Sequence, residues 1–141
     1  MMILVDTSVW SLAIRRQDKA LSAEENEIKQ ELAELIKEGR AQLIGPVRQE
    51  LLSGIRTDAQ YEVLRADLRA FDHPELTVED YEEAARTSDR CRAKGLMGSA
   101  VDFLICAVAM RRNWQILTSD RDFLGYAQRV PIRLYTLRAH R

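Results

Sequence analysis

Short runs of apolar residues alternate along the chain with longer segments in which apolar positions recur every three or four residues. The runs at 2–5, 41–44, 114–117 and 132–135 have the length expected of buried strands. The longer segments have the period of helices that pack one face against a core. Strands that alternate with helices indicate a parallel sheet with helices on both faces, so we predict an α/β protein.

Capping and breaking residues mark the ends of the predicted helices. Ser22 with Glu25, and Thr77 with Asp80, have the spacing of a capping box, in which two polar groups satisfy donors at a helix start. Pro46 is typical of the first turn of a helix. The predicted helices are a short one after residue 9 that ends at Arg15 and Arg16, followed by segments 22–38, 45–55, 57–71, 77–94, 99–113 and 120–129.

The composition is that of an ordinary globular domain. The 141 residues are 46% hydrophobic and 30% charged, which is close to the average for globular proteins. The sequence contains no repeat and no linker, so we expect one domain over residues 1–141. No stretch nears the roughly 18 apolar residues of a membrane span, and the start lacks the features of a signal peptide. We therefore expect a cytoplasmic protein.

The net charge and the positions of Cys and His limit the kinds of nucleic-acid and metal binding that the sequence allows. The net charge of −1 argues against tight nonspecific binding of nucleic acid, although 17 of the 21 basic residues are arginine, which binds phosphate well. Cys91, Cys106, His73 and His140 are isolated from one another, whereas a zinc site needs such residues at close spacing. A bound metal must therefore have oxygen ligands.

Four acidic residues lie where a parallel sheet binds its ligands. Asp6 and Asp120 each follow a predicted strand and precede a helix. Glu50 lies in the first turns of the helix after the second strand, and Asp102 lies in the first turn of the helix at 99–113. Because ligands bind beyond the carboxyl ends of parallel strands, we expect these four carboxylates to meet at one edge of the sheet.

Each of these residues also has an ordinary structural explanation when it is taken alone. Asp6 has the position of an N-cap, and Asp120 suits the positive end of a helix dipole. Glu50 borders the packed face of its helix, where a side chain can also reach water. The spacing of a capping box occurs twice more, in Ser99 with Asp102 and in Ser119 with Asp122.

Asp102 is the residue that a structural role explains least well. Every other residue from Val101 to Met110 is apolar, which is typical of a helix buried on all sides. A carboxylate in such a helix costs several kcal/mol of stability unless a partner compensates its charge. No lysine lies nearby in the sequence. A cation shared with other carboxylates would compensate the charge of Asp102 more completely than a helix cap.

A cluster of carboxylates suits a hard divalent cation such as Mg²⁺ or Mn²⁺, because several unpaired negative charges repel one another. One or two such ions would lower the pKa of a bound water and stabilise charge on a phosphodiester. Asp120 is the preferred ligand over Asp122, which is left as a cap or a supporting residue. Four hydroxyl side chains flank the acids and could bond a water or a phosphate oxygen, namely Thr7, Ser8, Thr118 and Ser119.

The four acidic segments together resemble a PIN domain. The segments are Ile-Leu-Val-Asp6-Thr-Ser-Val, the helix of Glu50, Asp102-Phe-Leu-Ile-Cys-Ala and Ile-Leu-Thr-Ser-Asp120-Arg-Asp-Phe, and their order is most similar to VapC-type toxins of bacterial toxin–antitoxin systems. The resemblance spans nearly the whole chain. One departure is that bulky Phe103 and Leu104, with Cys106, stand where the family usually has small alanines.

The resemblance implies a three-layer α/β/α sandwich and a Mg²⁺ or Mn²⁺ site at Asp6, Glu50, Asp102 and Asp120. It also implies endoribonuclease activity on RNA, a homodimer, and inhibition by a cognate antitoxin protein.

Two other functions fit parts of the sequence. The first is a binding module of the same fold with an idle metal site, although the intact set of four acids argues against it. The second is a phosphatase or phospho-acceptor domain with Asp6 as nucleophile, although Thr7 and Ser8 follow where such domains place a second acid. Four arginines at helix ends are candidates for phosphate contact, namely Arg15, Arg16, Arg111 and Arg112.

Overall fold

The computed structural model describes residues 1–14 and 21–138, and its centre is a small parallel sheet. The strands are β1 (Ile3–Val5), β2 (Ala41–Gln42) and β3 (Gln115–Leu117), in the order β2-β1-β3. Ile3 pairs with Ala41 on one side and with Gln115 on the other, and every pairing is parallel. The carboxyl ends of β1 and β3 therefore lie together at one edge of the sheet, as the sequence predicted.

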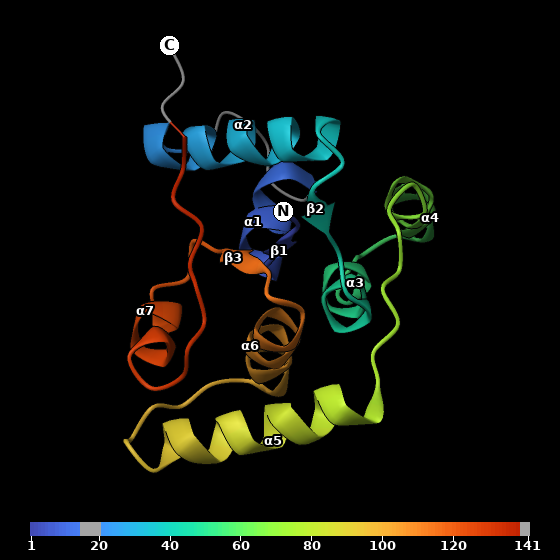
Figure 1. Ribbon diagram of the computed structural model, residues 1–141. Coiled ribbons are helices and arrows are strands. Elements are labelled where there is room, and N and C mark those ends of the chain that lie inside the picture. Colours follow the sequence, from blue (N-terminus) through green and yellow to red (C-terminus); the bar gives the residue numbers. More distant parts are fainter. Residues whose placement is uncertain (15–20, 139–141) are drawn as a thin grey trace.

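Helices cover both faces of this sheet. Within the described ranges they are α1 (Thr7–Ile14), α2 (Ala23–Lys37), α3 (Gly45–Leu52), α4 (Asp58–Leu68), α5 (Val78–Arg92), α6 (Ala100–Arg112) and α7 (Asp122–Ala127). Figure 1 shows α1 and α2 on one side of the sheet and α6 on the other, with α5 packed on the outer side of α6. The predicted α/β/α sandwich is thus confirmed. In the part of the chain that the structure describes, no helix is long and apolar enough to cross a membrane.

The capping signals place several helix starts correctly. Both predicted capping boxes form, with Ser22 and Glu25 at the start of α2 and Thr77 and Asp80 at the start of α5. Pro46 lies in the first turn of α3, as predicted. The last helix is shorter than predicted, because the backbone turns at 118–121 before α7 begins at Asp122. The predicted end of the first helix at Arg15 and Arg16 lies outside the described residues.

The predicted strand at 132–135 is wrong in extent. Only Leu134 pairs with the sheet, through a single parallel bridge to Ile116. Two backbone hydrogen bonds hold it there, from Ile116 N to the Arg133 carbonyl at 2.9 Å and from Tyr135 N to the Ile116 carbonyl at 2.7 Å. The chain then leaves the sheet, because the Tyr135 hydroxyl and Arg138 bond to Glu31 on α2 instead of to β3.

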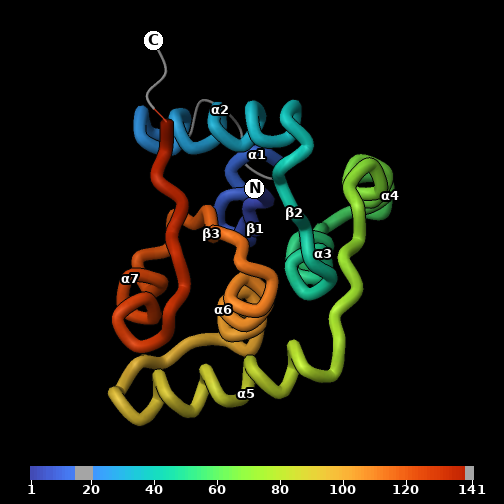
Figure 2. The backbone as a smooth tube through the Cα atoms, in the orientation of Figure 1, coloured from blue at the N-terminus to red at the C-terminus, as the bar shows by residue number. Residues whose placement is uncertain are grey.

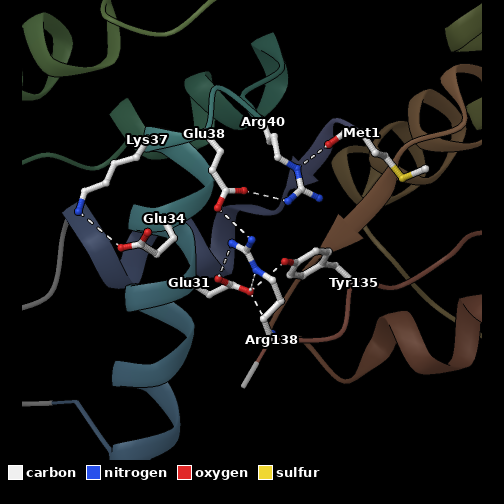
Figure 3. A network of polar contacts seen from close by, with 8 residues as sticks. All are labelled: Met1, Glu31, Glu34, Lys37, Glu38, Arg40, Tyr135 and Arg138. Atoms are coloured by element: carbon white, nitrogen blue, oxygen red, sulfur yellow. Dashed lines mark hydrogen bonds and ion pairs between the residues drawn. The ribbon is translucent and has the colours of Figure 1, made fainter. Parts of the chain in front are cut away.

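This C-terminal segment contacts Glu31, a fully buried carboxylate on α2. The Tyr135 hydroxyl donates to Glu31 Oε2 at 2.9 Å, and the backbone N–H of Arg138 donates to the same oxygen at 3.0 Å. The Arg138 guanidinium donates to both carboxylate oxygens of Glu31 at 3.0 Å and also pairs with Glu38 at 2.9 Å (Figure 3). Figure 2 shows the segment running past β3 to α2.

A second buried carboxylate joins α5 to the end of α6. Asp80 is 1% exposed, and its two oxygens accept from Arg111 Nε at 3.0 Å and from an Arg112 amino group at 2.8 Å. Arg112 also donates to the Glu75 carbonyl at 2.7 Å. Arg111 and Arg112, which the sequence offered as phosphate contacts, therefore neutralise a buried acid and fix α5 against α6.

We expect Asp80→Ala to lower the free energy of unfolding by about 2 kcal/mol, since it removes a helix cap and two charged hydrogen bonds. The neighbouring Glu79 is exposed in the same turn, so Glu79→Ala should change stability by less than about 0.5 kcal/mol. Urea unfolding followed by circular dichroism measures both. Equal midpoints for the two variants would contradict the structural role of Asp80.

Candidate functional site

Asp6 is the centre of a polar cluster at the carboxyl edge of the sheet. It follows β1 directly and is only 4% exposed. Its Oδ1 accepts from the backbone N–H of Thr7 at 2.8 Å. Its Oδ2 accepts from Ser8 Oγ at 2.7 Å and from Thr118 Oγ1 at 2.8 Å. Within the described part of the chain, the only backbone N–H that its side chain accepts from is that of the first helical residue, and its bond to Thr118 ties the end of β1 to the segment that follows β3.

Glu50 is joined to this centre through Thr7. The helix α3 carries Glu50 beside the start of α1, where Thr7 Oγ1 donates to Glu50 Oε1 at 2.6 Å. A surface hollow of about 450 Å³ opens here. It is lined by Thr7, Pro46, Gln49, Glu50, Ser53 and Val101. Glu50 therefore faces a space that a ligand can enter.

Asp120 lies on the other side of Asp6 and is held by Thr118. The Thr118 hydroxyl, which donates to Asp6, accepts from the backbone N–H of Asp120 at 3.0 Å. Asp120 Oδ1 in turn accepts from the N–H of Asp122 at 2.9 Å, at the start of α7. The predicted capping of Asp122 by Ser119 is wrong, because Asp120 takes that place. Ser119 contributes its backbone N–H, which donates to Ser8 Oγ at 3.1 Å.

Asp102 lies half-buried in the first turn of α6. Its N–H donates to Ser99 Oγ at 3.1 Å, so Ser99 caps the helix as predicted. The Asp102 side chain does not complete the capping box, since its Oδ2 accepts instead from the Tyr126 hydroxyl at 3.1 Å. Sequence reasoning missed this contact, because Tyr126 lies on α7 and only the fold brings that helix beside α6.

The charges of the cluster act on one another. Burial raises the pKa of Asp102 above its ordinary value, and the negative charges of Asp6 and Asp120 raise it further, while the hydrogen bond from Tyr126 lowers it. Burial also raises the pKa of Tyr126, and the charge of Asp102 adds to this effect. The charges of Asp6 and Asp120 are thus close enough to disfavour the ionised form of Asp102.

The neutralisation of these acids differs from that of buried acids elsewhere in the protein. Glu31 and Asp80 each pair with arginine. Over residues 1–14 and 21–138, by contrast, the four site carboxylates form no ion pair, and their hydrogen bonds come from hydroxyl and backbone N–H groups. Oxygen-rich, negatively charged and without a cationic side chain, this donor set suits a hard divalent cation.

The acids are linked but do not form a tight group of ligands. In the described ranges, no three His, Cys, Asp or Glu side chains converge closely enough to hold a metal ion as they stand.

Comparison with known proteins gives a family match over most of the chain and several similar folds. A family model described as the PIN domain matches residues 3–128. No curated protein sequence matches significantly. FitAcB from Neisseria gonorrhoeae is similar over 96% of this chain and 97% of its own, with 20% sequence identity and a TM-score of 0.69. VapBC2 from Rickettsia felis, solved bound to a DNA fragment from their promoter, is similar over 96% of this chain and 98% of its own, with 17% identity and a TM-score of 0.73. VapBC-1 from nontypeable Haemophilus influenzae is also similar, over 96% of this chain and 97% of its own, with 12% identity and a TM-score of 0.70.

The raised pKa of Asp102 predicts that its ionised carboxylate lowers the stability of the folded protein. A raised pKa in the folded state means that the ionised carboxylate disfavours folding above that pKa. We therefore expect Asp102→Asn to raise the urea midpoint of metal-free protein at pH 7. The gain should shrink as the pH falls through the folded-state pKa and vanish below the ordinary value of 3.8.

The comparison needs EDTA in both samples, because a bound cation would reverse the sign. A purely capping role for the Asp102 side chain predicts instead that Asp102→Asn lowers the midpoint at pH 7. That result would contradict the electrostatic interpretation.

Proposed function

Because this chain belongs to the PIN domain family, we propose that it is a Mg²⁺- or Mn²⁺-dependent endoribonuclease that serves as the toxin of a toxin–antitoxin pair. The observation that carries the proposal is the arrangement of four carboxylates from four different segments around one edge of the sheet. Asp6 follows β1, Glu50 lies on α3, Asp102 on α6 and Asp120 follows β3. Thr7 and Thr118 connect Asp6 to Glu50 and Asp120 through hydrogen bonds.

The metal ligands we propose are Asp6, Glu50, Asp102 and Asp120. Bound there, Mg²⁺ or Mn²⁺ would lower the pKa of a water and stabilise negative charge on the phosphodiester. Three hydrogen bonds to Asp6 fix its carboxylate at the end of β1. Thr7 holds the carboxylate of Glu50, and Thr118 holds the backbone of Asp120 beside Asp6.

The hydroxyl and amide groups around the acids support the substrate and the ligands in different ways. Thr7, Ser8 and Thr118 act as donors to the acids. Ser119 and Asp122 use their backbone N–H groups and so fix the turn before α7. The hollow beside Glu50 is the route by which we propose RNA approaches, because it brings a backbone phosphate to the line of carboxylates.

The contacts of Asp6 argue against a phosphatase that uses this residue as nucleophile. Both of its oxygens already accept hydrogen bonds, and the residue is 4% exposed. A nucleophilic carboxylate needs an oxygen that reaches the phosphorus atom. Ligation of a metal ion fits this geometry better, because a carboxylate oxygen that accepts one hydrogen bond keeps a second lone pair for a cation.

The partners we propose follow from the family and its structural relatives. VapBC2 from Rickettsia felis was solved bound to a promoter DNA fragment, and a structure from Klebsiella pneumoniae is described as a toxin–antitoxin complex. By analogy, we propose that this chain forms a homodimer and is inhibited by an antitoxin protein. The antitoxin would be encoded by a short neighbouring reading frame with a DNA-binding N-terminal part.

Purified protein should cleave RNA with Mg²⁺ or Mn²⁺ and lose this activity in EDTA. Removing an outer-sphere group of a metal site commonly costs about 10- to 100-fold, so loss of a ligand in Asp6→Asn or Asp120→Asn should cost at least about 100-fold. Asp89→Asn is the matched control, because Asp89 is exposed on α5. Cleavage of a labelled RNA, with circular dichroism to confirm folding, measures these effects.

Activity that persists in EDTA, or full activity in a folded Asp6→Asn variant, would overturn the metal-dependent mechanism. Absence of cleavage in wild-type protein on a broad panel of RNAs would favour the idle binding module instead.

Expression in a bacterial host should arrest growth if the chain is a toxin. The Asp120→Asn variant should permit growth at the same expression level, because it lacks the proposed ligand. Co-expression of the neighbouring reading frame should restore growth to the wild-type chain. Colony counts with immunoblots measure the outcome, and equal arrest by wild type and variant would contradict a toxic nuclease activity.

A further inference from the structure

Tyr126 is a buried residue whose hydroxyl points at the site. Its side chain is 1% exposed, on α7. The ring packs against Phe103 with centroids 5.3 Å apart and against Phe123 at 5.2 Å. Its hydroxyl lies 3.1 Å from Asp102 Oδ2 and 3.2 Å from the Met97 carbonyl oxygen. The aromatic packing fixes the ring, so the position of the hydroxyl is fixed as well.

We propose that Tyr126 is a positioning residue for Asp102, which holds one carboxylate oxygen so that the other is presented to the metal. The inference rests on the metal site proposed above. Within residues 1–14 and 21–138, Oδ2 is the only side-chain oxygen of Asp102 that receives a hydrogen bond, so Oδ1 is the oxygen left for a cation. Without the hydroxyl, the carboxylate would turn more freely about its side-chain bonds.

The loop before α6 is shaped around this hydroxyl. A Cβ added to Gly98 would overlap the Tyr126 hydroxyl and would lie 2.9 Å from Phe103 Cζ. The backbone of the loop therefore approaches the tyrosine as closely as only glycine permits. The Met97 carbonyl lies 3.2 Å from the same hydroxyl and shares its single proton with Asp102, so the hydroxyl also connects this loop to α7. Tyr126 thus joins three segments at the point where Asp102 enters the site.

A second tyrosine supplies a matched control. Tyr135 also donates its hydroxyl to a buried carboxylate, at 2.9 Å from Glu31 Oε2, but on the face of the sheet covered by α2. Tyr135→Phe and Tyr126→Phe therefore remove the same chemical group from a similar contact. Both variants keep the ring, so the difference between them reports what the hydroxyl does at the site.

The experiment is a titration with Mn²⁺ alone, by calorimetry or by electron paramagnetic resonance of free Mn²⁺, on full-length protein. We expect Tyr126→Phe to bind Mn²⁺ about 10- to 100-fold more weakly than wild type, the range for a group that orients a metal ligand. Tyr135→Phe should bind as wild type does. In RNA cleavage at fixed low Mn²⁺, Tyr126→Phe should lower kcat, and excess Mn²⁺ should restore it.

Gly98→Ala tests the same point without removing the hydroxyl, since the added methyl group displaces it from Asp102. It should also weaken Mn²⁺ binding. Wild-type affinity for Mn²⁺ in folded Tyr126→Phe, or equal weakening in Tyr135→Phe, would overturn the inference. Failure of wild-type protein to bind Mn²⁺ would instead overturn the proposed metal site itself, so the two failures are distinguishable.

Discussion

The arrangement of the candidate site depends on the three hydrogen bonds that Asp6 accepts. Asp6 ends the central strand, so a bond to Thr118 joins β1 to the segment after β3. The adjacent Thr7 joins the same point to Glu50 on α3. The carboxylate is 4% exposed, and donors on both of its oxygens compensate for the loss of water. The parallel sheet brings the acids to one edge, and these hydroxyls fix them there.

The buried and half-buried acids of this protein are compensated in two ways. Glu31 and Asp80 are neutralised by arginine. The pair at Glu31 connects the C-terminal segment to α2, and the pairs at Asp80 connect α5 to α6. Asp102 has a tyrosine hydroxyl instead, and burial together with the neighbouring charges of Asp6 and Asp120 raises its pKa. In the first arrangement arginine neutralises the carboxylate, while in the second the ionised form of Asp102 lowers stability and, among the described residues, has no ion pair.

The helix α6 shows how packing and chemistry share one element. Residues Phe103 to Ala109 are all buried between the sheet and α5, so the helix cannot shift without disturbing the core. Asp102 stands one residue before this run, at the sheet edge. The bulky Phe103 packs against Tyr126 and so helps to place the hydroxyl that donates to Asp102.

Local patterns in the sequence were enough to predict the parallel sheet and most helix starts and to single out Asp6, Asp102 and Asp120, because strand period, capping boxes and a lone charge in an apolar helix act over a few residues. Glu50 was predicted mainly from the resemblance to a family. The contact of Tyr126 with Asp102 and the pairing of Arg138 with Glu31 join residues 24 and 107 positions apart, and nothing in their own segments requires a partner at that distance. The same holds for the end of the sheet, where the sequence predicted a strand at 132–135. Whether that segment pairs with β3 or turns to α2 depends on the competition between a ladder of hydrogen bonds and a buried carboxylate that needs donors, and only the tertiary structure decides it.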